Sequence, residues 1–152
     1  SLDNAKKMIN YNSQKTYSVK KPVRSFRDLE VYQKTLEASV IVVKDISAGL
    51  AKIKCPFVEE LVKCALGLPM ALASAHSTRF GNHENSISML ERILVGCNKM
   101  VVYLEQAKGI YGDKIDVELV DDLVRRYSEA RTKIFRLEKS WQKWYEPSQS
   151  RR

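Results

Sequence analysis

The sequence predicts an all-α protein, an antiparallel up-down-up-down four-helix bundle with a flexible basic N-terminal arm. Apolar residues recur at spacings of three and four in four successive segments, which is the period of a helix with one buried face. Only six glycines and four prolines occur among 152 residues, and most stand at helix-boundary positions, which argues against a many-turned β architecture. A chain of this length can build one core, so we expect one domain with tails.

The first helix is expected to begin after Ser25, whose hydroxyl suits an N-cap, with Asp28 three residues later as its capping-box partner. Gly49 is expected to end this helix. The three-to-four spacing assigns to its buried face Leu29, Tyr32, Leu36, Val40, Val43 and Ser47.

The second helix is expected to have Pro56 at its first position and to end at Gly81. Pro69 lies inside it and should kink it, because proline removes one backbone donor and crowds the preceding turn. Its predicted buried face consists of Leu61, Cys64 or Ala65, Leu68, Leu72 and Ala75.

The third and fourth helices show the longest patterns. The third carries a heptad-like seam of Ile87, Leu90, Leu94, Cys97, Val101 and Leu104, and it should close near Gly109 before a Tyr111-Gly112-Asp113 turn. The fourth should run from about Asp116 until Pro147, or roughly 45 Å for about 30 residues. Its broad apolar face comprises Val117, Val120, Val124, Tyr127, Ile134, Leu137 or Glu138, Trp141 and Trp144.

The net charge of +8 is concentrated at the two ends of the chain. Residues 1–27 hold seven Lys and Arg against one Asp, residues 28–122 hold ten against fourteen acids, and residues 123–152 hold nine against three. We therefore divide the chain into a flexible basic arm (1–24), a bundle (25–146) and a basic C-terminal tail (147–152). A polyanion contact is expected at the basic extremities.

The last helix carries a basic stripe. On a helical wheel Arg125, Arg136, Lys139 and Lys143 fall within about 60° of one another, with Arg126 and Lys133 on one flank. Such a stripe could follow phosphates with an affinity that falls as salt rises. An ordinary solvated helix face explains it equally well. Lys20, Lys21 and Arg24 of the arm could likewise fold onto a nucleic acid or only keep the chain soluble.

Three aromatic residues stand beside these cations. Trp141 continues the core register, so packing is its expected role. For Trp144 and Tyr145 core packing, contact with another protomer and stacking on unpaired bases remain open.

Groups that could carry catalysis are few. His76 and His83 could converge to bind a metal or exchange protons, but no third ligand stands at matching spacing, and a solvated or capping pair is the simpler interpretation. Cys64 and Cys97 fall on core faces, and no C-x-x-C pair or glycine-rich phosphate loop occurs. We expect no enzyme activity, cofactor, metal or small-molecule substrate. Without a bilayer-length apolar run or a secretory signal, the expected location is cytoplasmic, away from membranes.

The segment Phe26-Arg27-Asp28-Leu29-Glu30-Val31-Tyr32-Gln33-Lys34 resembles the opening of the four-helix bundle proteins encoded in intervening sequences of bacterial large-subunit ribosomal RNA genes. The same superfamily includes Avd, the accessory protein of diversity-generating retroelements, and the resemblance covers roughly residues 25–145. The intervening-sequence proteins usually have Ser-Ile-Pro-x-Asn-Ile-Ala-Glu-Gly where this chain has residues 68–75, which keep the proline and Ala73 but lack the Asn, Glu and Gly. The ending, with Leu137 and Trp141, is similar to the last helix of Avd.

The resemblance implies a homopentameric barrel of bundles with a basic surface that binds nucleic acid. For Avd it also implies a reverse transcriptase partner that copies a template RNA with adenine-directed errors. The function expected from the sequence is therefore that of an Avd-like, non-enzymatic, nucleic-acid-binding accessory protein. The alternatives are a bundle protein of the intervening-sequence type and a protein-interaction scaffold without nucleic-acid binding.

Overall fold

The computed structural model describes the backbone of residues 22–149 and the side chains of residues 22–145. This part of the chain is helical and contains no strand, which confirms the all-α prediction. The predicted arm residues Lys20 and Lys21 lie outside it. Within these residues no helix is both long and apolar enough to span a membrane.

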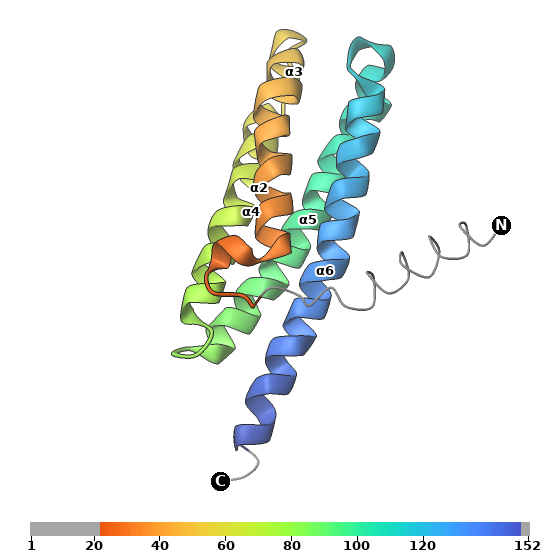
Figure 1. The fold of residues 1–152 in the computed structure, drawn as a ribbon. Coiled ribbons are helices and arrows are strands. Elements are labelled where there is room, and N and C mark those ends of the chain that lie inside the picture. Colours follow the sequence, from red (N-terminus) through yellow and green to blue (C-terminus); the bar gives the residue numbers. More distant parts are fainter. Residues whose placement is uncertain (1–21, 150–152) are drawn as a thin grey trace, which may run out of the picture.

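Four long helical segments lie side by side (Figure 1). The first comprises α2 (Glu30–Ile41), the π-helical η2 (Val42–Ser47) and α3 (Ala48–Lys52). The others are α4 (Val58–Thr78), α5 (His83–Tyr111) and α6 (Val117–Gln149), with a 3-10 turn, η3 (Gly112–Lys114), between the last two. In Figure 1 the chain rises through α2 and α3, descends α4, rises along α5 and descends α6. α2 contacts both α4 and α6, so the four segments surround one core.

The capping box at Ser25 is present as predicted. Ser25 Oγ accepts a hydrogen bond from Arg27 N (3.2 Å), and Asp28 Oδ2 accepts one from Ser25 N (3.1 Å). The capped element is a short 3-10 helix, η1 (Phe26–Asp28), rather than the long helix. The α-helix begins only at Glu30, because the backbone of Leu29 is extended.

The buried face predicted for the first helix is wrong for three of its residues. Leu36, Val40 and Val43 are 42%, 47% and 38% exposed. The face that packs inward is offset from it and consists of Val31, Thr35, Ala38, Ser39, Val42, Ile46 and Leu50. Burial of its two hydroxyls is possible because Thr35 Oγ1 donates to the carbonyl of Val31 (2.8 Å) and Ser39 Oγ to that of Leu36 (2.7 Å).

The π-helical turn of η2 sets the second half of this face. A π turn contains more residues than an α turn. Side chains four apart, those of Val42, Ile46 and Leu50, therefore stay on one buried line. The helix also continues past Gly49, contrary to the prediction, and the chain turns instead at Lys54, whose φ is 58°.

α4 buries the predicted face, and it contains Pro69 as an internal, buried residue. It begins at Val58, two residues after Pro56, and ends at Thr78, before Gly81. The approach of α4 to α5 is close at Gly96, where an added Cβ would stand 2.4 Å from Leu68 Cδ2. This approach explains why a residue without a side chain occupies that position.

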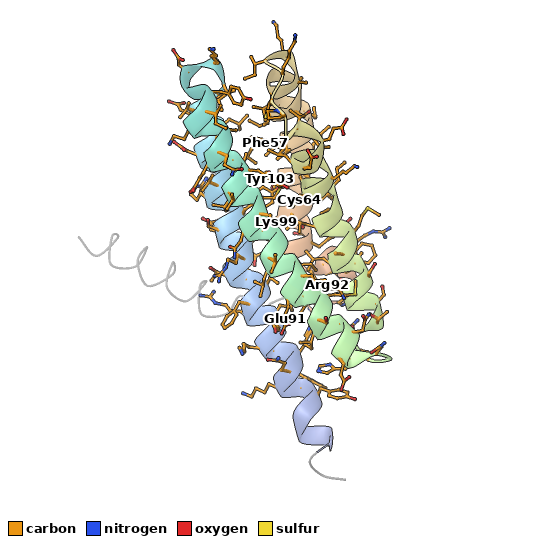
Figure 2. All side chains as sticks on the ribbon, turned by 180° about the vertical axis from the view of Figure 1, so that it is seen from behind. Phe57, Cys64, Glu91, Arg92, Lys99 and Tyr103 are labelled. Atoms are coloured by element: carbon orange, nitrogen blue, oxygen red, sulfur yellow. The ribbon has the colours of Figure 1, made fainter. Side chains whose placement is uncertain are left out.

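α5 buries Leu90, Cys97 and Leu104 of its predicted seam, whereas Ile87, Leu94 and Val101 are half-buried. At the upper end of the α4–α5 pair, Phe57 stacks on Tyr103 with ring centroids 5.8 Å apart (Figure 2). The helix ends at Tyr111, two residues beyond the expected Gly109. Gly112 follows with a φ of 54°, a backbone conformation that glycine adopts without strain.

α6 starts as expected, because Asp116 Oδ1 accepts a hydrogen bond from Leu119 N (3.1 Å). It does not end at Pro147 but continues to Gln149. A proline removes only its own N–H from the helical ladder, so the backbone can remain helical for a short distance beyond it. On the apolar face Glu138 is buried, and Trp144 is not part of the core because it is 81% exposed.

Candidate nucleic-acid interface

The first half of the basic stripe on α6 is neutralised by neighbouring carboxylates. Arg125 pairs with Asp122 and with Glu129 (3.6 Å), and Arg126 pairs with Asp122 (2.7 Å) and with Glu37 of α2 (3.4 Å). Hydrogen bonds from Arg126 and Arg125 lower the pKa of Asp122. Each of these arginines must give up or share a carboxylate before it can bind a phosphate.

Lys133 is also paired across the boundary between α6 and α2. Its Nζ lies 3.1 Å from Glu30 Oε1, and the same carboxylate lies 3.9 Å from Lys34. Three of the six predicted cations of α6 therefore take part in ion pairs, and two of those pairs connect α6 to α2.

The second half of the stripe has a different environment. Arg136, Lys139 and Lys143 are exposed, and among the described side chains no carboxylate lies within ion-pair distance of them. Trp144 projects next to them with 81% of its surface exposed. We call these four residues the basic end. Its three cations are the part of the predicted stripe that can meet a phosphate without breaking an ion pair between described side chains.

One aromatic side chain beside the basic end was not predicted from the sequence. Phe135 is 48% exposed, and Lys139 Nζ lies 5.2 Å from its ring centre in a cation–π contact. Phe135 follows the core residue Ile134 directly, so it was not considered as a surface residue. Its spacing of four from Lys139, which places the two side chains on the same side of the helix, could have indicated the contact.

The other two aromatic residues of the predicted interface pack inward on histidines. The Trp141 ring lies 6.3 Å from that of His76, and Tyr145 stacks on His83 with ring centres 3.8 Å apart and planes within 9°. Trp141 thus packs as expected from its register. Tyr145 shares its ring face with His83, so Trp144 is the aromatic residue that the fold leaves most open.

Both histidines therefore have a packing role at this end of the molecule. His76 is buried, and its Nδ1 lies 3.1 Å from Arg79 Nη1. Burial, together with the neighbouring Arg79 guanidinium, lowers the pKa of His76. Within residues 22–145 no three His, Cys, Asp or Glu side chains are grouped so that they could hold a metal ion.

Arg24, the one predicted arm residue that is described, is exposed and lies next to the capping box, where its backbone N donates to Asp28 Oδ2 (2.9 Å). η1, to which this segment leads, packs against α2 and α4. The side chains of Arg24 and of the basic end thus come from different elements.

The half-buried Cys64 and the buried Cys97 lie close together, away from the basic end. Cys64 Sγ donates to the carbonyl of Gly96 (3.5 Å), and burial raises the pKa of Cys97 to about 12. A thiol with so high a pKa is a poor nucleophile. The hydroxyl of Tyr127, which is fully buried, has no hydrogen-bond partner among the described residues.

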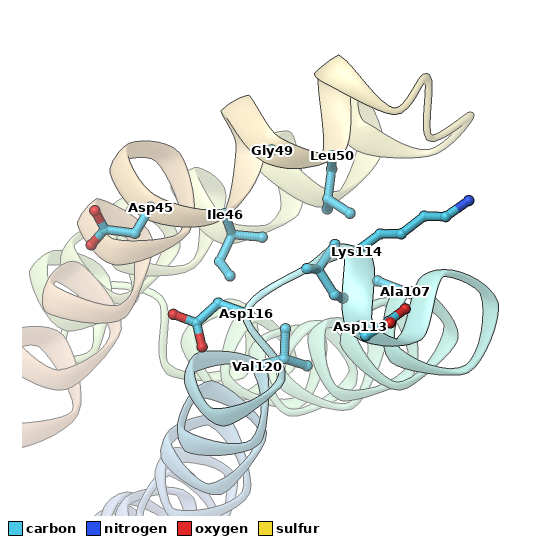
Figure 3. Close-up of a pocket in the computed structure, with 10 residues that line it drawn as sticks. Asp45, Ile46, Gly49, Leu50, Ala107, Asp113, Lys114, Asp116 and Val120 are labelled. Carbon is cyan, nitrogen blue, oxygen red and sulfur yellow. The ribbon is translucent and has the colours of Figure 1, made fainter.

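A cavity of about 180 Å³ lies where α3, the end of α5 and the start of α6 meet (Figure 3), at the end of the bundle opposite to the C-terminal end of α6 (Figure 1). Its apolar floor includes Ile46, Leu50 and Val120, and Asp45, Asp113 and Asp116 line it together with Lys114. Its charge is unfavourable for a polyanion, which further distinguishes the basic end as the candidate interface.

Comparison of the chain with models of known protein families, with curated proteins and with solved structures found no match.

Proposed function

We propose that this chain is an oligomeric, non-enzymatic nucleic-acid-binding accessory protein of the Avd type. In this role it would assist the reverse transcriptase of a diversity-generating retroelement in mutagenic cDNA synthesis from a template RNA. The observation that supports nucleic-acid binding is the basic end, where Arg136, Lys139 and Lys143 are exposed beside the exposed Trp144 and form no ion pair with a described side chain. The reverse transcriptase and the pentameric state come from the resemblance described above.

The basic end has the composition that a single-stranded or structured RNA requires. Cations neutralise phosphates, and an exposed tryptophan offers a face on which an unpaired base can stack. Three phosphate contacts would give a plot of log K against log salt a slope of about −2 for a single strand and about −3 for a duplex. In the proposal the chain is an up-down-up-down bundle in the cytoplasm, and its basic N-terminal arm, with Lys20, Lys21 and Arg24, adds further contacts.

The test is a mobility shift with a structured RNA at about 50 and about 200 mM salt. The variant Arg136→Gln/Lys139→Gln/Lys143→Gln should bind much more weakly and lose most of the salt dependence. The matched control is Arg125→Gln/Arg126→Gln/Lys133→Gln, which removes the same charge from the paired half of the stripe. If both triple variants lose affinity equally, the basic end has no special role, and absence of RNA binding at the lower salt would end the proposal.

Oligomerisation is supported by exposed apolar side chains on two helices, which together we call the apolar row. Leu36, Val40 and Val43 lie on one side of the first helix, and Leu66 and Met70, 45% and 72% exposed, lie one turn apart on α4. Exposed apolar surface of this kind often marks an interface between chains. Light scattering of the Val40→Ser/Met70→Ser variant should give a smaller particle than the original chain. An unchanged mass would exclude this row as the interface.

The same apolar row also favours the alternative function, an interaction scaffold without nucleic-acid binding, for which Trp144 would be a protein contact. Co-purification after nuclease treatment separates the two functions. A protein partner that is retained, together with no RNA binding by the purified chain, would favour the scaffold.

A further inference from the structure

The face formed by α4 and α5 combines exposed valines with exposed cations. Figure 2 looks onto this face, where Phe57, Tyr103, Cys64, Lys99 and Arg92 follow one another down the two helices. Val95 and Val102 of α5 are 57% and 51% exposed. They are seven residues apart, which places them about 10.5 Å apart along one line of the helix.

The cations of this face lie between the valines and α4. Arg92 and Lys99 of α5 are also seven apart, and on the helical wheel they fall between the valine line and Gly96, which touches α4. Lys99 lies next to Cys64 of α4 in Figure 2, where its charge opposes the rise that burial causes in the pKa of Cys64. Lys63, next to Cys64 in the chain, adds a cation from the α4 side.

These three cations have no internal counterpart. Lys63, Arg92 and Lys99 are exposed, and no ion pair joins any of them to a carboxylate within the part of the chain that the structure describes. Two acids lie nearby, Glu60 and Glu91. Glu91 hydrogen-bonds Glu138 of α6, so it belongs to the α5–α6 side. Counted against Glu60, the three cations leave the α4–α5 face with a net charge of +2.

We infer that the α4–α5 face docks an acidic amphipathic helix of a partner protein, with carboxylates over Lys63, Arg92 and Lys99 and an apolar edge over Val95 and Val102. Helices that bind on such surfaces present apolar anchors at spacings of three, four and seven, which match the spacing of the two valines. Electrostatic complementarity then selects the partner and its orientation. A phosphate backbone would use the cations but would leave the valines without a partner.

This face is separate from the basic end, so the inference does not depend on nucleic-acid binding. The two sites together would make the chain an adaptor that holds an RNA at the end of α6 and a protein on α4 and α5. Each site can fail without the other, because different residues form them.

The test uses a fluorescent synthetic peptide of about 18 residues, roughly 27 Å long as a helix, with leucines along one edge and glutamates along the next. A scrambled peptide of the same composition is its control. Fluorescence anisotropy should show binding of the amphipathic peptide and a loss of about tenfold or more for the scrambled one, because scrambling separates the two edges.

Two variants locate the site. Each variant should lower the affinity for the amphipathic peptide by about tenfold. The first removes the cations, Lys63→Gln/Arg92→Gln/Lys99→Gln, and the second removes the apolar contacts, Val95→Ser/Val102→Ser. Arg136→Gln/Lys139→Gln/Lys143→Gln, which removes as many charges from α6, should leave this affinity unchanged. Circular dichroism verifies that each variant is folded; all the substituted residues are exposed, so folding should persist.

Four results would overturn the inference. The first is no binding of the amphipathic peptide, and the second is equal binding of the scrambled peptide. The third is a self-association that Val95→Ser/Val102→Ser removes, which would assign the face to a second copy of this chain. The fourth is a loss of RNA binding in Lys63→Gln/Arg92→Gln/Lys99→Gln as large as in the α6 variant, which would assign it to nucleic acid.

Discussion

Glu138 provides the sharpest test of the fold, because a buried carboxyl here faces a second one. The side chain is 5% exposed on the inner side of α6. Burial, together with a hydrogen bond to Glu91, raises the pKa of Glu138, and the neighbouring Lys139 opposes the rise. A raised pKa means that the contribution to stability is fully present below the ordinary glutamate value and is lost as pH rises through the raised one. Glu138 therefore holds α6 to α5 less well at pH 7 than at acidic pH.

The substitution Glu138→Gln should therefore raise the unfolding free energy at pH 7. The amide has the shape of the protonated carboxyl and can donate a hydrogen bond to Glu91 without charge. A hydrogen bond of this kind contributes about 1 kcal/mol, which for a chain of this size raises the Tm by about 3 °C at pH 7. The gain should shrink as pH falls towards about 4, where the original carboxyl is itself protonated.

Urea unfolding followed by circular dichroism at several pH values measures the difference in unfolding free energy between the variant and the original chain. The difference is needed because burial also lowers the pKa of His76. Protonation of His76 destabilises both proteins as pH falls, and this effect would mask the contribution of Glu138 in either protein alone. Glu105→Gln, at an exposed position of α5, is the control and should change nothing. A Glu138→Gln variant that is less stable at pH 7, or a gain that does not depend on pH, would refute the reasoning.

Three further changes test the packing of the core and of the α6 end. Tyr127→Phe should raise the unfolding free energy by about 1 kcal/mol, because the substitution removes a buried hydroxyl that has no described hydrogen-bond partner. Urea unfolding measures this change, and a loss of stability would instead indicate a water bound to the hydroxyl. Gly96→Ala should cost about 1–3 kcal/mol, since its Cβ meets Leu68 at 2.4 Å, and a neutral result would show that Leu68 moves freely. His83→Ala should speed amide hydrogen exchange in the last turns of α6, because it removes the ring stacked on Tyr145, and unchanged exchange would show that the stack does not hold the helix.

The four helical segments and their order could be predicted because local chemistry determines them, although most of their ends differ by a few residues from the expected ones. Ser25 and Asp116 cap where their side chains indicate, and the seams of α4 and α5 keep a regular apolar period. The face of α2 could not be found in this way. Two interleaved stripes of this helix are compatible with burial, and the buried one contains Thr35 and Ser39, which resemble surface residues until their hydrogen bonds within the helix are seen.

The basic stripe could be predicted from the sequence, but its division into a half with ion pairs and a half without them could not. Spacing along α6 shows that Arg125 and Arg136 share a side of the helix. It cannot show that Arg125 lies within reach of Asp122 and Glu129, because rotamers and neighbouring helices decide which pairs form. The stacking of Tyr145 on His83 depends in the same way on the register between α5 and α6, which no local pattern contains.

The division of the stripe follows from the unequal lengths of the helices. α2 begins at Glu30, and this first residue pairs with Lys133 of α6. Because the two helices run in opposite directions, the residues of α6 beyond Lys133 lie past the start of α2, where it has no further carboxylate to offer. α6 nevertheless continues to Gln149 and carries Arg136, Lys139 and Lys143 past that point. Among the described side chains, the cations of the basic end thus lack ion-pair partners as a consequence of architecture.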